Sequence, residues 1–528
     1  MLQTVRSRRG MVVAPHHLAA RAGARILEEG GNAIEAMVAA ASAIAITYPH
    51  MNGLGGDNFW LIHTPGQDVV GIDACGGAAG KADCALFKAH DKIPERGPLA
   101  ALTVAGAVSG WQEALTISRS DWGGTMPIDR LLEEATFLAD DGIAVTRTQA
   151  VNTAGKLTEL SGVPGYTETY LDAGTIPQEG DRFRQPRLAE TLRHLVRNGF
   201  ENFYRGDLAK AISADLMKVG SPLELSDLER HRALRVKPLS VSIRGHQVYN
   251  MPPPTQGLAS LMLLGIYAQL GVAKAEGFEF VHGLLEATKL AFLVRDRHVS
   301  DPIYMNVDPA SFLDDATLEA MAADIDPIRA LPWPEASAPG DTVWLGAIDG
   351  QGRAVSFIQS IYWEFGSGVV LDETGITWQN RGVSFSLDPE HHNLLMPHRR
   401  PFHTIQPALA HLTDGRVMIY GTMGGEGQPQ TQAMLFARHV LHGQDLQQAV
   451  SAPRWLLGRT WGAEATNIRI ENRIDPAVIE ALRSVGHDVG VIGPFDEVMG
   501  HAGALVRHPD GLMEGAADPR SDGQVAAF

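Results

Sequence analysis

The sequence changes character at residue 342, and this change is the strongest constraint on the fold. Upstream, apolar side chains recur about every 3.6 positions, which predicts helices at 127–141, 187–198, 208–219, 257–270 and 281–297. Residues 330–341 (ALPWPEASAPGD) are rich in Pro and Ala and predict an extended, exposed linker. Residues 342–348 and 353–360 then read as strands around the turn Asp349-Gly350-Gln351-Gly352, which predicts a hairpin. The chain therefore joins a helix-rich half to a strand-rich half.

The first sixty residues show a second ordered pattern. Two helical segments within 16–47 flank the break at 29–32, where Gly30 suits a C-cap and Asn32 an N-cap. A glycine-rich loop at 52–58 follows and leads into a strand at 59–62. This order is the reverse of a dinucleotide fingerprint, so a dinucleotide oxidoreductase is only a distant alternative. The remaining predicted elements are strands at 368–371, 376–378, 408–412 and 417–420 and helices at 429–442 and 476–485.

Composition narrows the class of partner. The formal net charge of −17 opposes nucleic acid and anionic membranes, so a small anionic substrate needs a local basic pocket. Two cysteines, Cys75 and Cys84, make no disulfide framework, and no secretory signal or membrane span is apparent, which predicts a cytoplasmic protein. The pairs His16-His17 and His391-His392 lack a metal-binding motif, so we expect no metal and no cofactor.

Several short motifs, in order along nearly the whole chain, match one family. They are LEEGGNA at 27–33 with Gly55-Gly56, GGTMP at 123–127, YNMPPPTQG at 249–257, FGSGVV at 365–370, Arg400-Pro401, GTMGG at 421–425 and GAADPRSD at 515–522. On these motifs the sequence resembles the γ-glutamyltransferase family of N-terminal nucleophile hydrolases. The resemblance implies a precursor that cuts itself before a threonine and an α/β (α+β) fold, a four-layered αββα sandwich.

The spacing to the hairpin turn identifies the threonine that the resemblance implies. The nucleophile of the family starts a strand whose turn carries an Asp, which here selects Thr342 ahead of Asp349. The expected cut lies between Asp341 and Thr342. It gives a large piece, 1–341, and a small piece, 342–528, that together form one intertwined globular unit.

Cleavage supplies the base that a threonine hydroxyl lacks. The freed α-amine of Thr342 has an unperturbed pKa of about 7.7–8.0, so part of it is neutral near pH 7 and can accept the proton of its own hydroxyl. In the precursor the same hydroxyl can attack the carbonyl of Asp341 and give an ester that water resolves. One residue thus serves both maturation and turnover.

The resemblance also assigns the groups around the nucleophile. The backbone N–H groups of Gly424 and Gly425 match the oxyanion hole of the family, although a plain turn after a strand would read the same way. Ser360 and Tyr362 match positions that support the threonine, and Tyr362 stands where an Asn is usual.

The substrate pocket departs from the pattern of the family. Cys75 takes the place of the Arg that holds the α-carboxylate of a γ-glutamyl group, and Ser384 replaces the Asp that holds its amine. Arg381 replaces a Gln, and His403 and Thr404 replace a pair of serines. Arg with His and Thr donors favours an anion without an ammonium group, such as the amide of a small dicarboxylic acid. The member of the family with that activity converts oxamate to oxalate and ammonia.

Two other functions remain open beside that one. A γ-glutamyltransferase or glutathione hydrolase could take its clamp from elsewhere in the chain, and an anion-binding protein could keep the scaffold without cleavage or turnover. Asp57, beside the glycine loop, either touches the pocket or caps a turn. The expected partners are the substrate and the two cleaved chains for each other, and a homodimer of processed units is left open.

Overall fold

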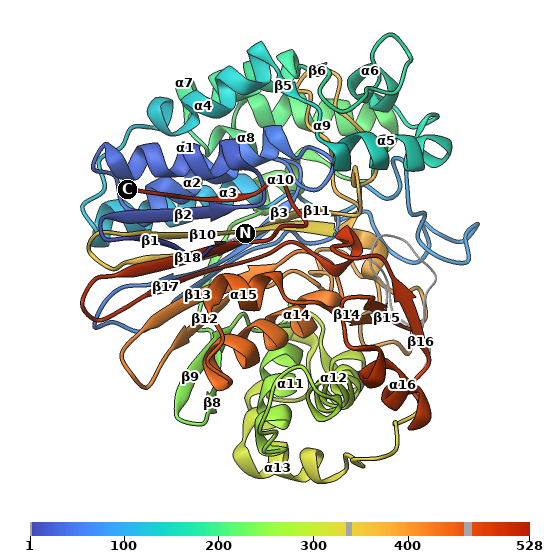
Figure 1. Ribbon diagram of the computed structural model, residues 1–528. Helices are drawn as coiled ribbons and strands as arrows, with labels where there is room; N and C mark the ends of the chain where they lie inside the picture. Colours follow the sequence, from blue (N-terminus) through green and yellow to red (C-terminus); the bar gives the residue numbers. More distant parts are fainter. Residues whose placement is uncertain (1–2, 334–340, 459–466) are drawn as a thin grey trace.

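In the computed structural model, two β-sheets face each other and helices cover the outer face of each (Figure 1). The structure describes residues 3–333, 341–458 and 467–528. Three apolar clusters separate the layers, one between the two sheets and one between each sheet and its helices. The predicted αββα sandwich is confirmed. Most of the predicted linker at 330–341 lies outside the described residues.

Each sheet has seven strands within the described residues, and neighbouring strands run antiparallel. The first sheet runs in the order β19 (Gln524–Ala527), β2 (Gly10–Ala14), β10 (Asp341–Asp349), β11 (Ala354–Tyr362), β3 (Asp57–His63), β4 (Val70–Ala74) and β7 (Leu234–Val236). The second runs β1 (Val5–Ser7), β18 (Met513–Ala517), β17 (Ala502–Arg507), β13 (Val417–Thr422), β12 (Ala408–His411), β9 (His246–Asn250) and β8 (Leu239–Ile243). Both sheets therefore take strands from each side of residue 342.

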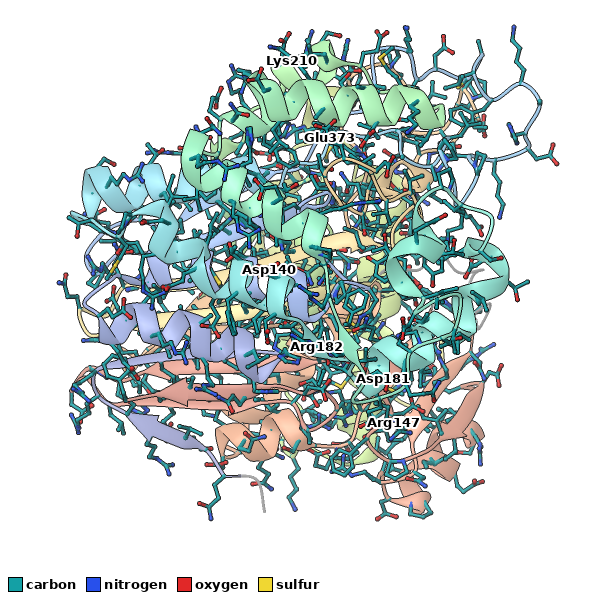
Figure 2. All side chains as sticks on the ribbon, turned by 90° about the horizontal axis from the view of Figure 1, so that it is seen from above. Asp140, Arg147, Asp181, Arg182, Lys210 and Glu373 are labelled. Atoms are coloured by element: carbon teal, nitrogen blue, oxygen red, sulfur yellow. The ribbon has the colours of Figure 1, made fainter. Side chains whose placement is uncertain are left out.

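The helices form the two outer layers. The layer over the first sheet, at the top of Figure 1, holds α1 (His17–Glu28), α2 (Ala33–Thr47), α3 (Ala107–Asp121), α4 (Ile128–Asp141), α5 (Arg147–Leu160), α6 (Tyr166–Tyr170), α7 (Pro186–Asn198), α8 (Asn202–Arg205), α9 (Asp207–Val219) and α10 (Leu225–Arg230). The opposite layer holds α11 (Gly257–Gln269), α12 (Phe278–His298), α13 (Asp315–Ala323), α14 (Gly427–Phe436), α15 (Leu446–Ser451) and α16 (Pro476–Ser484). Charged side chains such as Asp140 and Lys210 cover the first layer (Figure 2).

Side-chain alternation along β10 fixes which face meets which layer. Val343, Leu345 and Ala347 belong to the core beneath the first helical layer, whereas Trp344 and Ile348 belong to the core between the sheets. Both faces of the strand are buried, which explains its nearly continuous apolar sequence. The pairing with β11 shifts in register between Asp341 and Val343, so the contacts of Thr342, rather than this alternation, show which layer its side chain meets.

The helical break at 29–32 forms as the sequence predicts. Gly30 has φ +93°, and the Asn32 side chain accepts from the N–H groups of Ile34 and Glu35 at 3.0 and 3.1 Å. Glu35 accepts from the N–H of Asn32 in return, which completes a capping box. Asn32 also donates to Ser118 Oγ at 2.7 Å and thereby ties α2 to α3.

We expect Asn32→Ala to lower the free energy of unfolding by about 1–2 kcal/mol, because the variant loses the cap and leaves buried donors unpaired. The matched control is Asp475→Ala, which removes the exposed cap of α16, where Asp475 accepts from Ala477 at 2.9 Å. Denaturant titration followed by circular dichroism measures both. Equal effects of the two substitutions would contradict the added role of Asn32 as a link between helices.

Some predicted elements are wrong. The predicted strands at 368–371 and 376–378 are loop segments joined by the isolated bridge Val370–Thr377, because Gly366, Gly368 and Gly375 have positive φ and bend the chain. Strands β7, β8 and β9 lie inside the half predicted as helical. The predicted helix at 429–442 is α14 followed by the π-helical turn Ala437–Leu441.

Within the described residues, no helix combines the length and the apolar character that crossing a bilayer requires.

Candidate functional site

Thr342 lies at the start of β10, fully buried between the sheets. Gln428, in the first turn of α14, donates from Nε2 to Thr342 Oγ1 at 3.4 Å. Its own Oε1 accepts from the backbone N–H of Gln406 at 3.2 Å, so the amide cannot turn freely. A side chain from the second sheet's layer therefore positions the hydroxyl of a residue in the first sheet.

Three polar residues lie side by side on the inner face of the first sheet. Thr342 is the second residue of β10, Ser360 lies near the end of the neighbouring β11, and Ser360 pairs with Asp57 at the start of β3. Asp57 is in phase with Phe59 and Leu61, and both belong to the core between the sheets. The row of strand ends thus places Asp57 two strands from Thr342, on the same face.

The loop after β13 contains Gly424 with φ +113° and Gly425 with φ +51°. Two successive left-handed residues let the chain turn sharply from β13 into α14, and the Gly424 carbonyl accepts from Gly427 at 2.7 Å. The helix that opens here carries Gln428. The predicted oxyanion loop and the predicted nucleophile are therefore joined through one amide side chain.

A buried polar frame that the sequence did not reveal holds this loop. Gln256 Nε2 donates to the carbonyls of Gly425 at 2.8 Å and Thr404 at 2.6 Å, so one side chain fixes two loops of the site. Arg295 from α12 donates to Gln256 Oε1 at 3.1 Å and pairs with Glu426 at 2.7 Å. Gln256 belongs to one of the family motifs, but nothing in its spacing predicts these partners.

Arg381 lies in a 3₁₀ turn at Arg381–Ser384 and is almost fully buried. Its Nη1 donates to Thr404 Oγ1 at 3.4 Å, and its guanidinium lies 3.7 Å from the ring centroid of Tyr362. Burial lowers the pKa of Arg381 to about 10, so the group remains charged at neutral pH. Its Nη2 has no hydrogen-bond partner among the described residues. A buried cation with a vacant donor is suited to a small anion.

His403 lies next to this cation. Its imidazole is fully buried, packs edge-on against Phe59, and neither ring nitrogen has a hydrogen-bond partner among the described residues. Burial, reinforced by Arg381 and Arg400, holds the pKa of His403 well below its usual range. The ring is therefore neutral at pH 7 and offers one donor and one acceptor.

Asp57, beside the glycine loop, holds two backbone turns and lies close to His403. Its Oδ1 accepts from the backbone N–H groups of Gly76 at 3.2 Å and Gly106 at 2.9 Å, which fixes the adjoining turns. Its Oδ2 has no hydrogen-bond partner among the described residues and lies 3.7 Å from His403 Nε2. Burial raises the pKa of Asp57 to about 7. An acidic group therefore lies beside the buried cation Arg381 and the neutral ring of His403.

Cys75 and Ser384, at the two positions where the family has its clamp residues, lie in different surroundings. The Cys75 thiol is buried within electrostatic reach of Asp57 and Arg381, and burial raises its pKa well above the usual range. The Ser384 hydroxyl donates to the carbonyl of Phe402 at 3.0 Å and borders a cavity of about 180 Å³. Tyr362 lines the same cavity and contacts Arg381 with its ring, so it lies between the cavity and the guanidinium.

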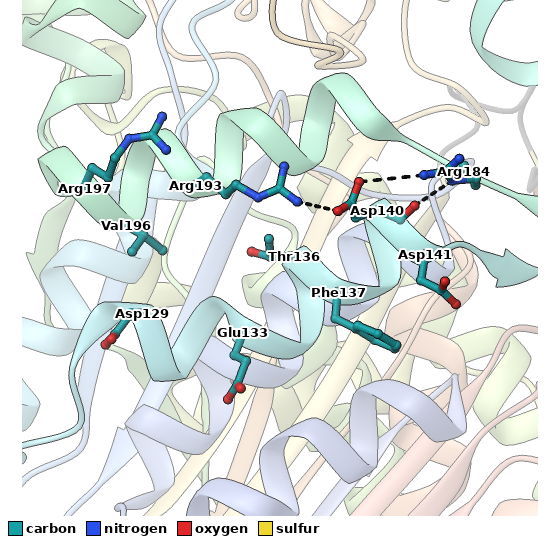
Figure 3. A pocket seen from close by; sticks show the side chains of 10 residues that line it. All are labelled: Asp129, Glu133, Thr136, Phe137, Asp140, Asp141, Arg184, Arg193, Val196 and Arg197. Atoms are coloured by element: carbon teal, nitrogen blue, oxygen red, sulfur yellow. Dashed lines mark hydrogen bonds and ion pairs between the residues drawn. The ribbon is translucent and has the colours of Figure 1, made fainter.

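Two other features of the structure do not belong to this site. A hollow of about 600 Å³ between α4 and α7 contains Asp140 flanked by Arg184 and Arg193, which pair with it (Figure 3). None of the residues lining it is one of the predicted site residues. Its opposed charges are already paired across the two helices.

A buried group of His282, Glu286 and His487 has metal-ligand chemistry, but its ligand atoms are already in use. The two imidazoles bond to each other at 2.8 Å, and His282 also contacts the carbonyl of Asp326. Lys289 donates to Glu286 at 2.7 Å, and an ammonium group there opposes a cation. The cluster therefore fits a structural role in which it fastens the chain near residues 326–331.

Comparison with known proteins accords with the geometry. The family model described as gamma-glutamyltranspeptidase matches residues 19–528. An oxamate amidohydrolase proenzyme from Klebsiella pneumoniae subsp. pneumoniae is 55% identical over 522 residues, covering 99% of each chain. A glutathione hydrolase-like proenzyme from Bacillus subtilis is 39% identical over 531 residues, covering 100% of each chain. The crystal structure of a cephalosporin acylase from Bacillus halodurans superimposes with a TM-score of 0.91 at 33% identity, covering 100% of this chain and 97% of the other. The chain belongs to the gamma-glutamyltranspeptidase family, and it is a hydrolase of the N-terminal nucleophile type.

Proposed function

We propose that the protein is a self-processing amidohydrolase that converts oxamate to oxalate and ammonia, with Thr342 as its nucleophile. The observation that carries the proposal is the buried Thr342 hydroxyl, held by Gln428 from the helix that opens directly after Gly424-Gly425. The choice of oxamate rests on the vacant, buried Arg381 and on the 55% identity to a protein named for that activity.

Maturation uses the hydroxyl of Thr342 against its own chain. The Oγ attacks the carbonyl carbon of Asp341, the C–N bond of the Asp341–Thr342 peptide breaks, and an ester replaces it. Water then hydrolyses the ester, which leaves a carboxylate on residue 341 and a free amine and hydroxyl on Thr342. The products are residues 1–341 and 342–528.

Turnover repeats the same attack on the substrate. The α-amine of Thr342 accepts the hydroxyl proton as Oγ bonds to the amide carbon, and the N–H groups of Gly424 and Gly425 receive the developing oxyanion. When the intermediate collapses, the proton passes to the leaving nitrogen, which departs as ammonia. Water activated by the same amine hydrolyses the acyl ester and restores the hydroxyl.

The pocket residues hold the other end of the substrate. Arg381 offers its vacant Nη2 to the carboxylate, and the neutral ring of His403 and the hydroxyl of Thr404 add hydrogen bonds. Ser360 and Tyr362 have supporting roles, because the Ser360 hydroxyl accepts from the N–H of Tyr362 at 2.8 Å and Tyr362 packs its ring on Arg381. This chemistry needs neither a metal nor a cofactor.

The two pieces are expected to stay together after the cut. Strand β10 of the small piece lies between β2 and β11, and β3, β4 and β7 of the large piece continue the same sheet. Separation would expose both sheets and the apolar core between them. We place the enzyme in the cytoplasm, where its two free cysteines remain reduced.

The test is an ammonia-release assay of the purified, self-cleaved protein. The substrates are oxamate, malonamate and the γ-amide of glutamate, glutamine, at equal concentration. We expect oxamate to give the highest kcat/KM. Failure to release ammonia from oxamate would overturn the proposed substrate. A wild-type protein that runs as one band on a denaturing gel would overturn the mechanism and favour a non-catalytic anion-binding protein.

A second candidate, γ-glutamyl hydrolysis, is favoured by one observation. Asp57 and Arg381 together supply an acidic and a basic group, which are the two charges that an α-amino acid end requires. Release of nitroaniline from a γ-glutamyl anilide, at a kcat/KM above that for oxamate, would select this candidate.

Gly424→Ala tests the oxyanion loop. A Cβ at φ +113° forces the backbone to shift, so the N–H groups of the loop no longer point toward the oxyanion. We expect kcat to fall about 100-fold for this reason. Gly443→Ala is the matched control, since Gly443 has φ +69° at an exposed turn with open space around its Cα. Steady-state ammonia release measures both, and a similar loss in the two variants would contradict a specific role for the loop.

A further inference from the structure

Asp57 lies at the far end of the site from the nucleophile. It starts β3, two strands from β10, and neighbouring strands are about 4.8 Å apart, so about 10 Å separates β3 from β10. A substrate whose amide carbon is at Thr342 therefore directs its other end toward Asp57, Arg381 and His403. For the substrate proposed above, that end is a carboxylate, and two negative groups would meet.

The hydrogen bonds of Asp57 distinguish its two oxygens. Oδ1 is saturated by the N–H groups of Gly76 and Gly106, whereas Oδ2 is buried and has no donor among the described residues. An ionised Oδ2 would depend on the neighbouring Gln379 side chain and on Arg381 to stabilise its buried charge. A proton on Oδ2 would instead turn this atom into a donor directed at the pocket.

The other titratable groups that face Asp57 keep one charge state near neutral pH. Arg381 is charged, His403 is neutral, and burial raises the pKa values of Cys75 and Tyr204, so both of these are neutral too. Arg381 favours the ionised form of Asp57 in the empty pocket. A ligand carboxylate that takes Arg381 removes this support and adds a like charge, which favours the protonated form.

We propose that Asp57 binds the carboxylate of the substrate as a neutral acid, donating its Oδ2–H, so that each bound carboxylate brings one proton from solvent into the pocket. The proposal rests on the proposed function, in that a carboxylate occupies Arg381. No covalent bond changes, and the proton returns to solvent when the product leaves. An acidic residue in this form selects for an anion and against an ammonium group. It thereby reconciles Asp57 with the absence of the amine clamp of the family.

Calorimetry of oxalate binding to the self-cleaved enzyme tests this directly, because oxalate is the proposed product and does not turn over. Titrations in buffers of different ionisation enthalpy report the protons exchanged. Since burial raises the pKa of Asp57 to about 7, we expect close to one proton taken up at pH 8 and close to none at pH 5.5. The affinity for oxalate should correspondingly fall up to about tenfold for each pH unit above 7.

Asp57→Asn keeps the acceptor for Gly76 and Gly106 and presents a permanent N–H donor, so this variant should bind oxalate with no proton uptake and little dependence on pH. Asp215→Asn is the matched control. Asp215 is a buried carboxylate in the outer helical layer that accepts from the backbone N–H of Glu373 at 2.8 Å, and the variant should behave as wild type. Self-cleavage on a gel reports that each variant folds.

The outcomes separate this inference from the proposed function. Ammonia release from oxamate without proton uptake at pH 8 would overturn the role of Asp57 alone. Uptake that persists in Asp57→Asn would assign the proton to the α-amine of Thr342 or to His403 and would also overturn it. Tighter binding of L-glutamate than of oxalate, lost in Asp57→Asn, would mean that Asp57 is ionised and holds an ammonium group. A wild-type enzyme that neither hydrolyses oxamate nor binds oxalate would overturn both proposals.

Discussion

Thr342→Ala is expected to leave the chain whole and to reduce ammonia release by at least about 1,000-fold. The substitution removes the only hydroxyl that both steps use, and an uncut chain also lacks the α-amine that serves as base. A denaturing gel should show one band of 528 residues in place of the pieces 1–341 and 342–528. Because Thr342 is fully buried and its methyl group is small, the fold should persist with a modest loss of stability.

Thr342→Ser is the matched control, since it keeps the hydroxyl and loses only the methyl group. We expect it to cleave itself, more slowly, and to retain measurable turnover, because Gln428 can still donate to the oxygen. A Thr342→Ala protein that still splits at the same bond would place the nucleophile elsewhere. An intact Thr342→Ser protein with normal circular dichroism would show that the methyl group is needed to orient the attack.

Local signals predicted the elements that depend on neighbouring residues. The break at Gly30 and Asn32 and the hairpin at Asp349 are formed by contacts within a few positions, so their residue types are informative. Strands β8 and β9 were missed because they are short and amphipathic. They pair with each other, and only β9 joins the rest of the sheet, through β12 about 160 residues further along the chain. The segment at 368–378 shows the converse, since buried apolar residues need not form a ladder when glycines turn the chain.

The residues of the site show the same difference between local and long-range contacts. Family motifs indicated Thr342 and the Gly424-Gly425 loop, whose geometry in the structure suits the roles predicted for them. They did not indicate the frame of Gln256 and Arg295, because its bonds join segments far apart in the sequence. The residues at the clamp positions suggested a site without an acidic partner for an amine, but the structure places Asp57 beside His403 and Arg381. A motif shows which residue has been replaced, but it cannot show which side chain from another segment takes the place of the lost one.

Arg381→Gln restores the residue that is usual in the family at this position and removes the cation proposed to hold the carboxylate. We expect kcat/KM for oxamate to fall about 100- to 1,000-fold, equivalent to about 3–4 kcal/mol, mostly through KM, because the buried charge-assisted hydrogen bonds are lost. The pKa of Asp57 should rise at the same time, since Arg381 favours its ionised form. Steady-state kinetics with oxamate measures the first effect.

Self-cleavage separates loss of binding from loss of the catalytic centre. Maturation acts on the chain's own carbonyl and needs no carboxylate at Arg381, so Arg381→Gln should still give the two bands. Arg399→Gln is the matched control, because Arg399 is also buried, packs on Tyr304 at 4.3 Å and bonds to backbone carbonyls outside the pocket. Its KM should stay within a few-fold of wild type. An unchanged KM in Arg381→Gln would mean that the substrate carboxylate is held by another group, and an uncut Arg381→Gln chain would make this residue part of the framework that Thr342 needs for attack.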